Sequence, residues 1–379
     1  MRIGRFNINF CWALPKKSEI LIFDVQGSKE IEKYVIKQIC NSYIYDSNKI
    51  KLYFNIFFLI RYIKNILTTT YMGFSLKRRL YITYLKTELE FINPKIIITY
   101  NDDNILYHNL ANVLKGVEFI AIQNGLREKF IRERVKHTIN HKYLYCFGYN
   151  DEKKNLSSNW HVKDLRPIGS LRAGIALSKF KSDNKLYDIC LISEYEPREK
   201  NDPDNHHWND HWLKVSEILS EILINKNYRI IVALSGRGGS GSREKEYFKY
   251  LYSRSMSTQH IRFTDINTDL DSYRAILESN VTIGFCSTLL VESIALKSKA
   301  LQINTSTDNT YFDFDKSFIH MYSKNSELEK KIDELVSIPY DAYYEDIKDY
   351  IPQYMNIDIN NLPQNKIHQD IKNILYNKR

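Results

Sequence analysis

Short apolar runs alternate with longer amphipathic segments along the N-terminal part of the chain. Four runs are almost wholly apolar and of strand length: EILIFDV (19–25), KIIITY (95–100), EFIAIQ (118–123) and YLYCFG (143–148). Helical periodicity marks residues 28–39, 76–92 and 104–114, with Ser28 as a cap of the first helix and Pro94 just beyond the second. Apolar strands separated by helices predict a parallel sheet that is buried on both faces.

A second series of the same kind follows a polar stretch at residues 150–185, where we expect an interdomain linker. Its expected strands are residues 186–195, 228–236, 261–265, 281–287 and 299–306, and its expected helices lie near 208–225, 242–254, 271–280 and 288–296. Two successive α/β series predict two Rossmann-like domains whose parallel sheets face each other across a cleft. We expect an N-terminal domain over 1–170, a C-terminal domain over 185–340 and a tail over 341–379 that packs back.

Composition and charge narrow the class of protein. The 379 residues are 43% hydrophobic and 26% charged, which is typical of globular chains. The net charge of +9 fits a phosphate-bearing substrate, an anionic membrane surface or nucleic acid. Nucleic acid fits least, because the basic residues are spread along the chain and no nucleic-acid-binding motif is present. The five cysteines have no pairable spacing, which favours buried thiols in a reducing compartment.

The segment LYFNIFFLIRYIKNIL (52–67) is the most apolar stretch of the chain that has helical length. Four polar residues interrupt it, and it is shorter than the roughly 20 apolar residues of a membrane-spanning helix. Two interpretations remain open, namely a helix that packs on its own domain and a helix that lies at a membrane interface. No signal peptide is expected, because Arg2 and Arg5 precede no sustained apolar core.

Polar residues follow five of the expected strands, at the end where parallel sheets bind ligands. The clusters are Asn101-Asp102-Asp103-Asn104, Gln123-Asn124-Gly125-Leu126-Arg127, Ser193-Glu194-Tyr195-Glu196, Ser235-Gly236-Arg237-Gly238-Gly239-Ser240 and Cys286-Ser287-Thr288. Each cluster alone is an ordinary turn composition. Because five of them lie at the same end of two sheets, we expect a ligand site there.

Two of these clusters suit a nucleotide. Ser287 and Thr288 open a helix directly after a strand, where free N–H groups and the helix dipole bind phosphate, and Glu292 lies one turn later, where it suits ribose hydroxyls. The alternative is an ordinary helix cap followed by a surface glutamate. The glycine-rich stretch SGRGGSGSREK (235–245) adds Arg237, Gly238 and Ser235 as phosphate ligands, unless it is only a flexible surface loop.

Several other chemistries find no support. The stretch HHWNDHW places His207 and His211 on one helix face, but Trp208 stands where a zinc protease carries its glutamate. No Gly-x-Ser-x-Gly elbow of a serine hydrolase and no Walker motif is present. We therefore expect neither a metal nor a cofactor.

At CSTLLVESIALKSKALQI (286–303) the chain resembles the donor-nucleotide element of GT-B glycosyltransferases. Further stretches, AIQNGLREKF, KYLYCFGYND, RPIGSLRAG, YDICLISEYE and YIPQYMN, resemble in the same order a group of bacterial surface-carbohydrate biosynthesis proteins. That group looks related to the retaining Kdo transferases of capsule and lipopolysaccharide O-antigen synthesis. The resemblance covers roughly residues 95–360 and implies a GT-B fold, a glycosyl transfer reaction and a nucleotide-sugar donor.

Relatives that transfer 2-keto sugar acids, such as Kdo or a nonulosonic acid, take them as CMP conjugates and need no metal, so the resemblance implies a CMP-linked donor. One departure matters. The Kdo enzymes carry an acidic nucleophile where this chain has Asn124. Because an amide cannot form a glycosyl ester, double displacement through this position is in doubt.

The remaining polar residues take roles from their chemistry. Asp102 or Asp103 is the expected base for the acceptor hydroxyl, unless the two only cap the following helix, and Glu194 is the second candidate. The residues expected to orient the sugar are Gln123, Asn124, Gly125, Arg127 and Glu196, with Arg127 suited to a sugar carboxylate, and Ser193 is expected to join the nucleotide ligands.

Three alternatives to a glycosyltransferase stay open on the same architecture. They are a sugar-nucleotide epimerase, a polyol-phosphate transferase and a non-catalytic scaffold, the last kept open by Asn124. The basic charge and the 52–74 stretch suit a cytoplasmic enzyme that works peripherally at the inner membrane on a glycan or lipid-linked acceptor.

Overall fold

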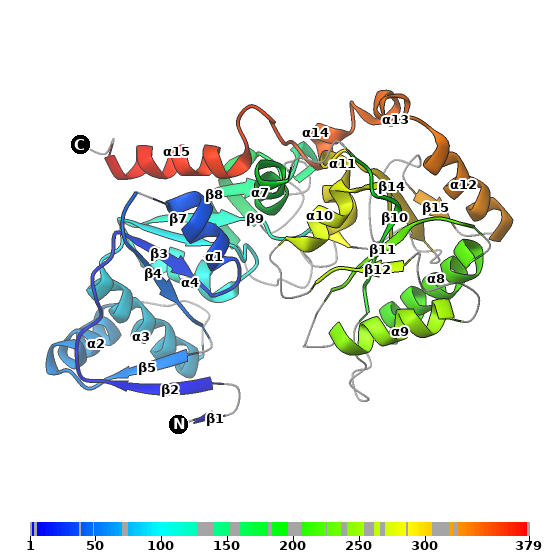
Figure 1. The fold of residues 1–379 in the computed structure, drawn as a ribbon. Coiled ribbons are helices and arrows are strands. Elements are labelled where there is room, and N and C mark those ends of the chain that lie inside the picture. Colours follow the sequence, from blue (N-terminus) through cyan, green and yellow to red (C-terminus); the bar gives the residue numbers. More distant parts are fainter. Residues whose placement is uncertain are drawn as a thin grey trace. The chain divides into compact units, whose positions relative to one another are not determined.

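The computed structural model describes residues 2–3, 6–37, 39–47, 49–69, 75–126, 139–151, 160–180, 184–195, 206–224, 226–235, 241–253, 261–265, 270–285, 287–304, 319–321 and 325–376. The chain divides into two compact units (Figure 1). Unit 1 comprises Met1–Leu171 and Asp358–Arg379, and unit 2 comprises Arg172–Ile357. The C-terminal segment that the sequence suggested as one tail is therefore shared between the units.

Unit 1 is built on a six-stranded parallel sheet. Its strands are β3 (Ile20–Phe23), β4 (Ser42–Tyr45), β6 (Ile96–Thr99), β7 (Glu118–Ile122), β8 (Ile139–Cys146) and β9 (Trp160–Pro167), in the order β4-β3-β6-β7-β8-β9. Every residue of β3, β6 and β7 is buried, because helices cover both faces of the sheet. The expectation of a parallel sheet buried on both faces is confirmed.

The helices of unit 1 correct two expectations. The segment after β3 begins as α1 (Ser28–Glu30), continues as a π-helical turn, η1 (Ile31–Ile36), and ends before residue 39. Its N-cap is Gly27 and not Ser28, because the chain enters the helix through a left-handed residue with φ of 68°, a conformation that glycine adopts without strain. The helices α3 (Leu76–Ile92) and α4 (Ile105–Val113) lie where they were predicted.

A second, smaller sheet of unit 1 is absent from the sequence prediction. It joins β1 (Arg2–Ile3), β2 (Phe6–Cys11) and β5 (Lys49–Tyr53), and the helix α2 (Ile56–Thr68) follows it. The apolar stretch 52–67 is therefore not one helix, since its first two residues end β5 and Asn55 caps α2 by accepting a hydrogen bond from the amide of Phe57 (3.0 Å).

The predicted break at residues 150–185 contains the division between the units, but the segment is more than a linker. The segment contributes β9 to the sheet of unit 1 and the helix α7 (Leu171–Lys179). β9 pairs with β8 alone, so it is an edge strand, and an edge strand tolerates the polar sequence WHVKDLRP that hid it. The division between the units lies at Leu171 and Arg172.

Unit 2 contains a second six-stranded parallel sheet. Its strands are β10 (Tyr187–Ile192), β11 (Ile230–Ala233), β12 (Ile261–Phe263), β13 (Ser279–Gly284), β14 (Lys299–Asn304) and β15 (Ile319–Met321), in the order β12-β11-β10-β13-β14-β15. Its helices are α8 (His206–Ile224), α9 (Gly241–Ser253), α10 (Asp271–Leu277), α11 (Thr288–Ala295), α12 (Asn325–Ser337), α13 (Tyr340–Ile347) and α14 (Ile351–Tyr354). Its core includes Cys190, Ile231 and Ile276.

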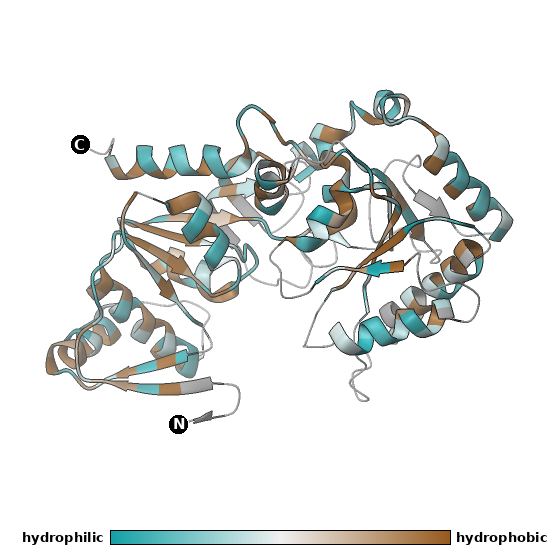
Figure 2. Cartoon of the chain, in the orientation of Figure 1, coloured by the Kyte–Doolittle hydropathy of each residue, from teal (hydrophilic) through white to brown (hydrophobic). Residues whose placement is uncertain are grey.

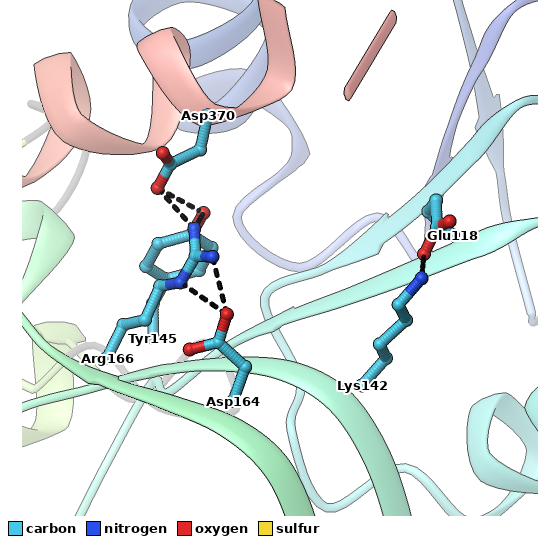
Figure 3. A network of polar contacts seen from close by, with 6 residues as sticks. All are labelled: Glu118, Lys142, Tyr145, Asp164, Arg166 and Asp370. Atoms are coloured by element: carbon cyan, nitrogen blue, oxygen red, sulfur yellow. Dashed lines mark hydrogen bonds and ion pairs between the residues drawn. The ribbon is translucent and has the colours of Figure 1, made fainter. Parts of the chain in front are cut away.

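The last helix, α15 (Pro363–Tyr376), belongs to unit 1 and is held there by a polar network (Figure 3). The carboxylate of Asp370 accepts hydrogen bonds from the guanidinium of Arg166 (2.6 Å) and the hydroxyl of Tyr145 (2.8 Å). The contact of Arg166 with Asp370 joins the edge strand β9 to the helix, and Asp164 of the same strand binds the guanidinium at 2.5 Å. Figure 3 includes a second ion pair, between Lys142 and Glu118, across β8 and β7.

Replacement of Asp370 by alanine is expected to loosen α15 from unit 1 by about 1 to 3 kcal/mol, because Arg166 and Tyr145 lose a shared charged acceptor. Hydrogen exchange of peptides from residues 363–376 measures this local opening. Asn365→Ala, an exposed substitution on the same helix, is the control and is expected to change protection little. Equal protection in both variants would show that the contacts of Asp370 do not hold the helix.

Candidate functional site

Strand order locates a switch point in each sheet. In unit 2 the chain builds outward from β10, first to β11 and β12 and then, on the other side, to β13, β14 and β15. The reversal lies between β10 and β13. In unit 1 the corresponding reversal lies between β3 and β6. In open α/β sheets ligands bind beyond the carboxyl ends of the strands at this point.

Glu194 bridges the switch point of unit 2. It lies two residues after β10, and its carboxylate accepts a hydrogen bond from the amide of Phe285 at the end of β13 (3.0 Å). Ser193 beside it is buried, and its hydroxyl accepts a hydrogen bond from the amide of Tyr195 (3.3 Å). The half-buried Glu194 therefore links the ends of the two strands between which a ligand is expected.

The helix α11 begins at the same place. Ser287 is its N-cap, with the hydroxyl accepting a hydrogen bond from the amide of Leu289 (3.3 Å), and Thr288 is its first residue. Both side chains are half-buried. Glu292 is no surface residue, since it is 3% exposed and both carboxylate oxygens lie 2.9 Å from the hydroxyl of Tyr273. The helix start faces the switch point, whereas Glu292 is anchored within the unit.

Ser235 follows β11 and brings in a residue that the sequence did not suggest. Its amide donates to the carboxylate of Glu244 (2.8 Å), and its hydroxyl donates to the carbonyl of Tyr195 (3.2 Å). Glu244 lies in the first turn of α9 and is fully buried. A carboxylate in a first helical turn is a detectable sequence signal, but only the fold shows that it fixes the end of β11.

Four expected ligands lie outside the described residues: Arg127, Glu196, Arg237 and Gly238. The side chains of His207 and His211 at the start of α8 lie outside them as well. Within the described part of the chain, no three histidine, cysteine, aspartate or glutamate side chains gather in a way that could hold a metal ion. In the same part, no helix is long and apolar enough to cross a bilayer.

The switch point of unit 1 carries an aspartate that the sequence analysis passed over. Asp24 directly follows β3, and its φ of 84° is uncommon for a residue with a side chain. Its carboxylate accepts a hydrogen bond from the side-chain amide of Asn104 (3.5 Å), which follows β6. The pair therefore bridges β3 and β6 much as Glu194 bridges the strands of unit 2.

Asp102 and Asp103 separate in role. The alternative that they cap α4 is wrong, because Asn104 is the cap and accepts from the amides of Leu106 (3.0 Å) and Tyr107 (3.2 Å). Asp103 is half-buried, whereas Asp102 is fully buried. Only Asp103 of the two therefore combines a carboxylate with access to solvent.

Asp102 instead supports the loop after β7. Its carboxylate lies 3.4 Å from the amide of Asn124, and its carbonyl accepts a hydrogen bond from Nε2–H of His108 (2.8 Å). Burial lowers the pKa of His108 to about 4, although Asp102 and the Asp103 carboxylate act in the opposite direction. His108 is therefore a neutral imidazole at physiological pH.

The sequence pattern also misjudged Gln123. Its side chain is 2% exposed, and its two amide ends bind main-chain groups: the carbonyl of Gly125 (2.9 Å) and the amide of Phe147 (3.1 Å). Gln123 therefore shapes the loop between β7 and β8 and does not reach outward to a sugar. Asn124 and Gly125 are half-buried at the loop surface.

A hollow of about 960 Å³ lies elsewhere in unit 1, beside residues that precede the strands, such as Glu19, Asn41 and Lys95. A second hollow of about 580 Å³ is lined by Glu90, Asn93 and Lys115, among others. Neither of these two hollows is lined by a residue that was predicted for the ligand site.

Comparison with known proteins gives a family and a fold. A family model described as "putative O-antigen biosynthesis protein" matches residues 120–364, more than half of the chain. No curated protein matches the chain in sequence. The match confirms the resemblance to surface-carbohydrate biosynthesis proteins, while the likeness to Kdo transferases stays a prediction.

Solved structures agree on the architecture at low sequence identity. The UDP-GlcNAc 2-epimerase of Methanocaldococcus jannaschii superposes with a TM-score of 0.54 at 13% identity, over 94% of this chain and 99% of that one. The epimerase of Neisseria meningitidis gives 0.52 at 10% identity, over 95% and 99%. A glycosyltransferase of Rickettsia africae gives 0.48 at 13% identity, over 96% and 100%. The two epimerase superpositions confirm the expected α/β fold with parallel sheets.

Proposed function

Because the chain belongs to the O-antigen biosynthesis protein family, we propose that it is a glycosyltransferase of bacterial surface-polysaccharide synthesis. It transfers a sugar from a nucleotide-activated donor to a glycan or lipid-linked acceptor at the inner membrane. The observation that carries the proposal is the switch point of unit 2, where Glu194 joins β10 to β13 and Ser287 opens α11. The epimerases of similar fold act on UDP-GlcNAc, which supports a nucleotide-sugar ligand for this architecture.

Unit 2 binds the donor in this proposal. The N-terminus of α11 directs free amides and the positive end of the helix dipole at the phosphate, and Ser287 and Thr288 add hydroxyl donors. Arg237 and Gly238 supply a further cation and further amides. Glu292, which is buried against Tyr273, supports α11 from inside and reaches the ribose only if that contact opens.

Unit 1 binds the acceptor. Asp103 is the proposed base, which takes the proton of the acceptor hydroxyl as its oxygen bonds to the anomeric carbon of the donor sugar. The bond from that carbon to the phosphate oxygen breaks, and the nucleotide leaves with the electron pair and its negative charge. Asp102 and Gln123 position the loop of Asn124 and Gly125 beside the acceptor.

The proposed donor is a CMP-linked 2-keto sugar acid. Arg127 and the net charge of +9 suit a sugar carboxylate next to a phosphate. The amide of Asn124 cannot act as a nucleophile, so no glycosyl-enzyme ester forms at this position. The acceptor hydroxyl therefore attacks the donor sugar directly.

A thermal-shift screen against CMP, CDP, UDP, GDP and ADP tests the donor. A nucleotide at 100 times its Kd is expected to stabilise the folded protein by about 2.7 kcal/mol. We expect a response to CMP, and its loss in Ser287→Ala, which removes a cap and a phosphate ligand together. Asn55→Ala removes a helix cap in unit 1 and is the matched control, which should keep the CMP response. A response to UDP alone would discard the CMP donor, and silence from all five nucleotides would favour a scaffold.

A sugar-nucleotide epimerase is the second candidate, favoured by the TM-scores of 0.54 and 0.52 with two such enzymes. An epimerase converts its nucleotide sugar without an acceptor, whereas a transferase releases the nucleotide only as sugar is transferred. Incubation with the nucleotide sugar that binds, followed by separation of the products, distinguishes the two.

A further inference from the structure

The helix α2 departs from the usual arrangement, because it packs on unit 1 partly through polar residues and exposes most of its apolar residues. Its buried residues are Phe58 and Asn65. The side-chain amide of Asn65 donates to Thr87 (2.9 Å) and Glu90 (2.9 Å) of α3, and Arg61 forms an ion pair with the same Glu90 (2.6 Å). A helix packed in a globular domain normally turns its apolar stripe inward and its polar residues outward. In α2 these polar contacts and the ring of Phe58, which stacks on Tyr53 at 4.8 Å, together hold the helix to unit 1.

The opposite side of α2 is apolar and exposed. Ile56, Ile60, Ile63 and Leu67 recur at helical spacing along one stripe, with exposures of 61%, 59%, 57% and 80%. Phe57 beside them is 65% exposed. Figure 2 shows α2 as one of the predominantly hydrophobic helices of the chain.

Aromatic side chains at the ends of β2 and β5 extend this surface. Trp12 is 74% exposed, and its ring lies 5.4 Å from that of Phe54, which in turn lies 5.6 Å from Phe10. The side chain of Asn55, the cap of α2, donates to the carbonyl of Trp12 (3.4 Å), so the sheet residues and the start of the helix are neighbours. We call the combined surface the apolar face: Phe10, Trp12, Phe54, Ile56, Phe57, Ile60, Ile63 and Leu67.

The surroundings of the apolar face are uniformly basic in sequence. Residues 47–87 contain eight lysines and arginines and no aspartate or glutamate. Lys49, Lys64, Lys77 and Arg79 are exposed. This segment thus carries eight of the 54 basic residues of the chain and no acidic residue, and three of the eight form ion pairs with flanking carboxylates: Lys49 with Asp46, and Arg61 and Lys86 with Glu90.

The positive charge around the apolar face indicates which partner binds to it. A second copy of the chain would bring two basic segments together, and like charges across an interface oppose association. An anionic bilayer complements both features, since its acyl region accepts the apolar side chains and its headgroups attract lysine and arginine. With 13 residues, α2 is about 20 Å long, shorter than the roughly 30 Å hydrocarbon core, so it fits along the surface. Tryptophan is enriched at that depth.

We propose that the apolar face and its basic surroundings dock unit 1 onto the surface of an anionic phospholipid bilayer. The proposal names the membrane partner of the function proposed above, but it rests on unit 1 alone and needs no nucleotide. The side chains Ile60 and Ile63 enter the acyl boundary, and Lys64, Lys77 and Arg79 lie at the phosphate level. A lipid-linked acceptor would then diffuse in the plane to which unit 1 is bound.

The test is sedimentation of the full chain with vesicles of phosphatidylcholine, with and without phosphatidylglycerol, in the absence of nucleotide. We expect binding to the anionic vesicles that weakens at high salt. Ile60→Asp/Ile63→Asp should reduce binding at least about tenfold, because the variant loses the transfer of two apolar side chains out of water. Lys77→Glu/Arg79→Glu should abolish the preference for phosphatidylglycerol.

The matched controls make the same kinds of substitution at exposed positions elsewhere in the chain. Leu186→Asp/Ile359→Asp replaces two apolar side chains that are 47% and 63% exposed, and Lys249→Glu/Lys330→Glu reverses two exposed charges. Both controls should bind vesicles like the parent chain. Equal binding by the Ile60→Asp/Ile63→Asp variant, or no sedimentation with anionic vesicles, would overturn the proposal. A lipid-free dimer that the same variant dissociates, seen by light scattering, would assign the face to a second copy instead. Since no nucleotide is present, loss of the donor response leaves this result unchanged.

Discussion

A Gly27→Ala variant is expected to lose about 3 to 5 kcal/mol of stability in unit 1. Gly27 has a φ of 68°, which costs a residue with a side chain about 1 to 2 kcal/mol. A Cβ at this position would also lie 2.3 Å from Cδ1 and 2.4 Å from Cγ of the Tyr100 ring. Because Tyr100 is 2% exposed, its ring can move only against packed neighbours, so overpacking adds a few kcal/mol. Urea denaturation of the two proteins measures the loss.

The chain offers a matched control for the conformational part of this cost. Gly116 has a φ of 80°, but a Cβ there would meet nothing within 4 Å. Gly116→Ala should therefore cost only the strain of the left-handed backbone, about 1 to 2 kcal/mol. If the two variants lose equal stability, the close approach of Gly27 to Tyr100 has no energetic weight.

The Gly27→Ala variant is also expected to affect function, because Gly27 and Tyr100 lie at the switch point of unit 1. Gly27 caps the helix after β3, and Tyr100 directly precedes Asn101 and Asp102 at the end of β6. A Cβ that displaces Tyr100 thus disturbs both strands of the unit 1 switch point. We expect acceptor binding to fail in Gly27→Ala under conditions where the variant remains folded, while the nucleotide response of unit 2 persists.

Acidification is expected to destabilise unit 1 through His108. The folded pKa of about 4 lies below the ordinary value of about 6.5, because the buried site disfavours the charged ring. Between these two values the unfolded chain binds a proton that the folded chain does not, so stability falls as the pH falls. The contribution is fully present above pH 6.5 and is lost toward pH 4, and it amounts to about 3 kcal/mol.

A His108→Gln variant isolates this contribution. Glutamine retains a side-chain amide donor for the carbonyl of Asp102 but does not titrate. Denaturation at pH 7.5 and pH 4.5 should show a smaller loss in the variant than in the parent chain, by about 2 to 3 kcal/mol. Hydrogen exchange of peptides from β6 and α4 provides the local measurement. The same pH dependence in both proteins would mean that His108 already binds its proton when folded.

Much of the architecture can be predicted from the sequence. The runs ILIF at β3 and IIIT at β6 are apolar throughout, and a strand buried on both faces requires that composition. Helical periodicity located α3, α4, α8, α9 and α11 within a few residues. The same reading failed for β9, whose polar sequence is tolerated only because the strand lies at the edge of the sheet.

The candidate site could be predicted only in part from the sequence. The clusters after β6, β7, β10, β11 and β13 could be selected because polar residues follow apolar strands. The directions in which their side chains point could not be predicted from the sequence. Gln123 turns inward to two main-chain groups, and Glu292 turns inward to Tyr273. Asp24, which was not predicted as a site residue, accepts a hydrogen bond from Asn104. Each of these depends on a partner remote in sequence or on backbone geometry.

The sequence by itself determined the central strands of both sheets and several helices, because burial and periodicity are properties of a few neighbouring residues. Only the tertiary structure decided the strand order, which places β10 beside β13 and β3 beside β6 and so makes Glu194 and Asp24 bridging residues. It also decided that α2 turns Asn65 inward and Leu67 outward. Strand order and helix orientation arise from contacts between segments far apart in the chain, and no local pattern contains them.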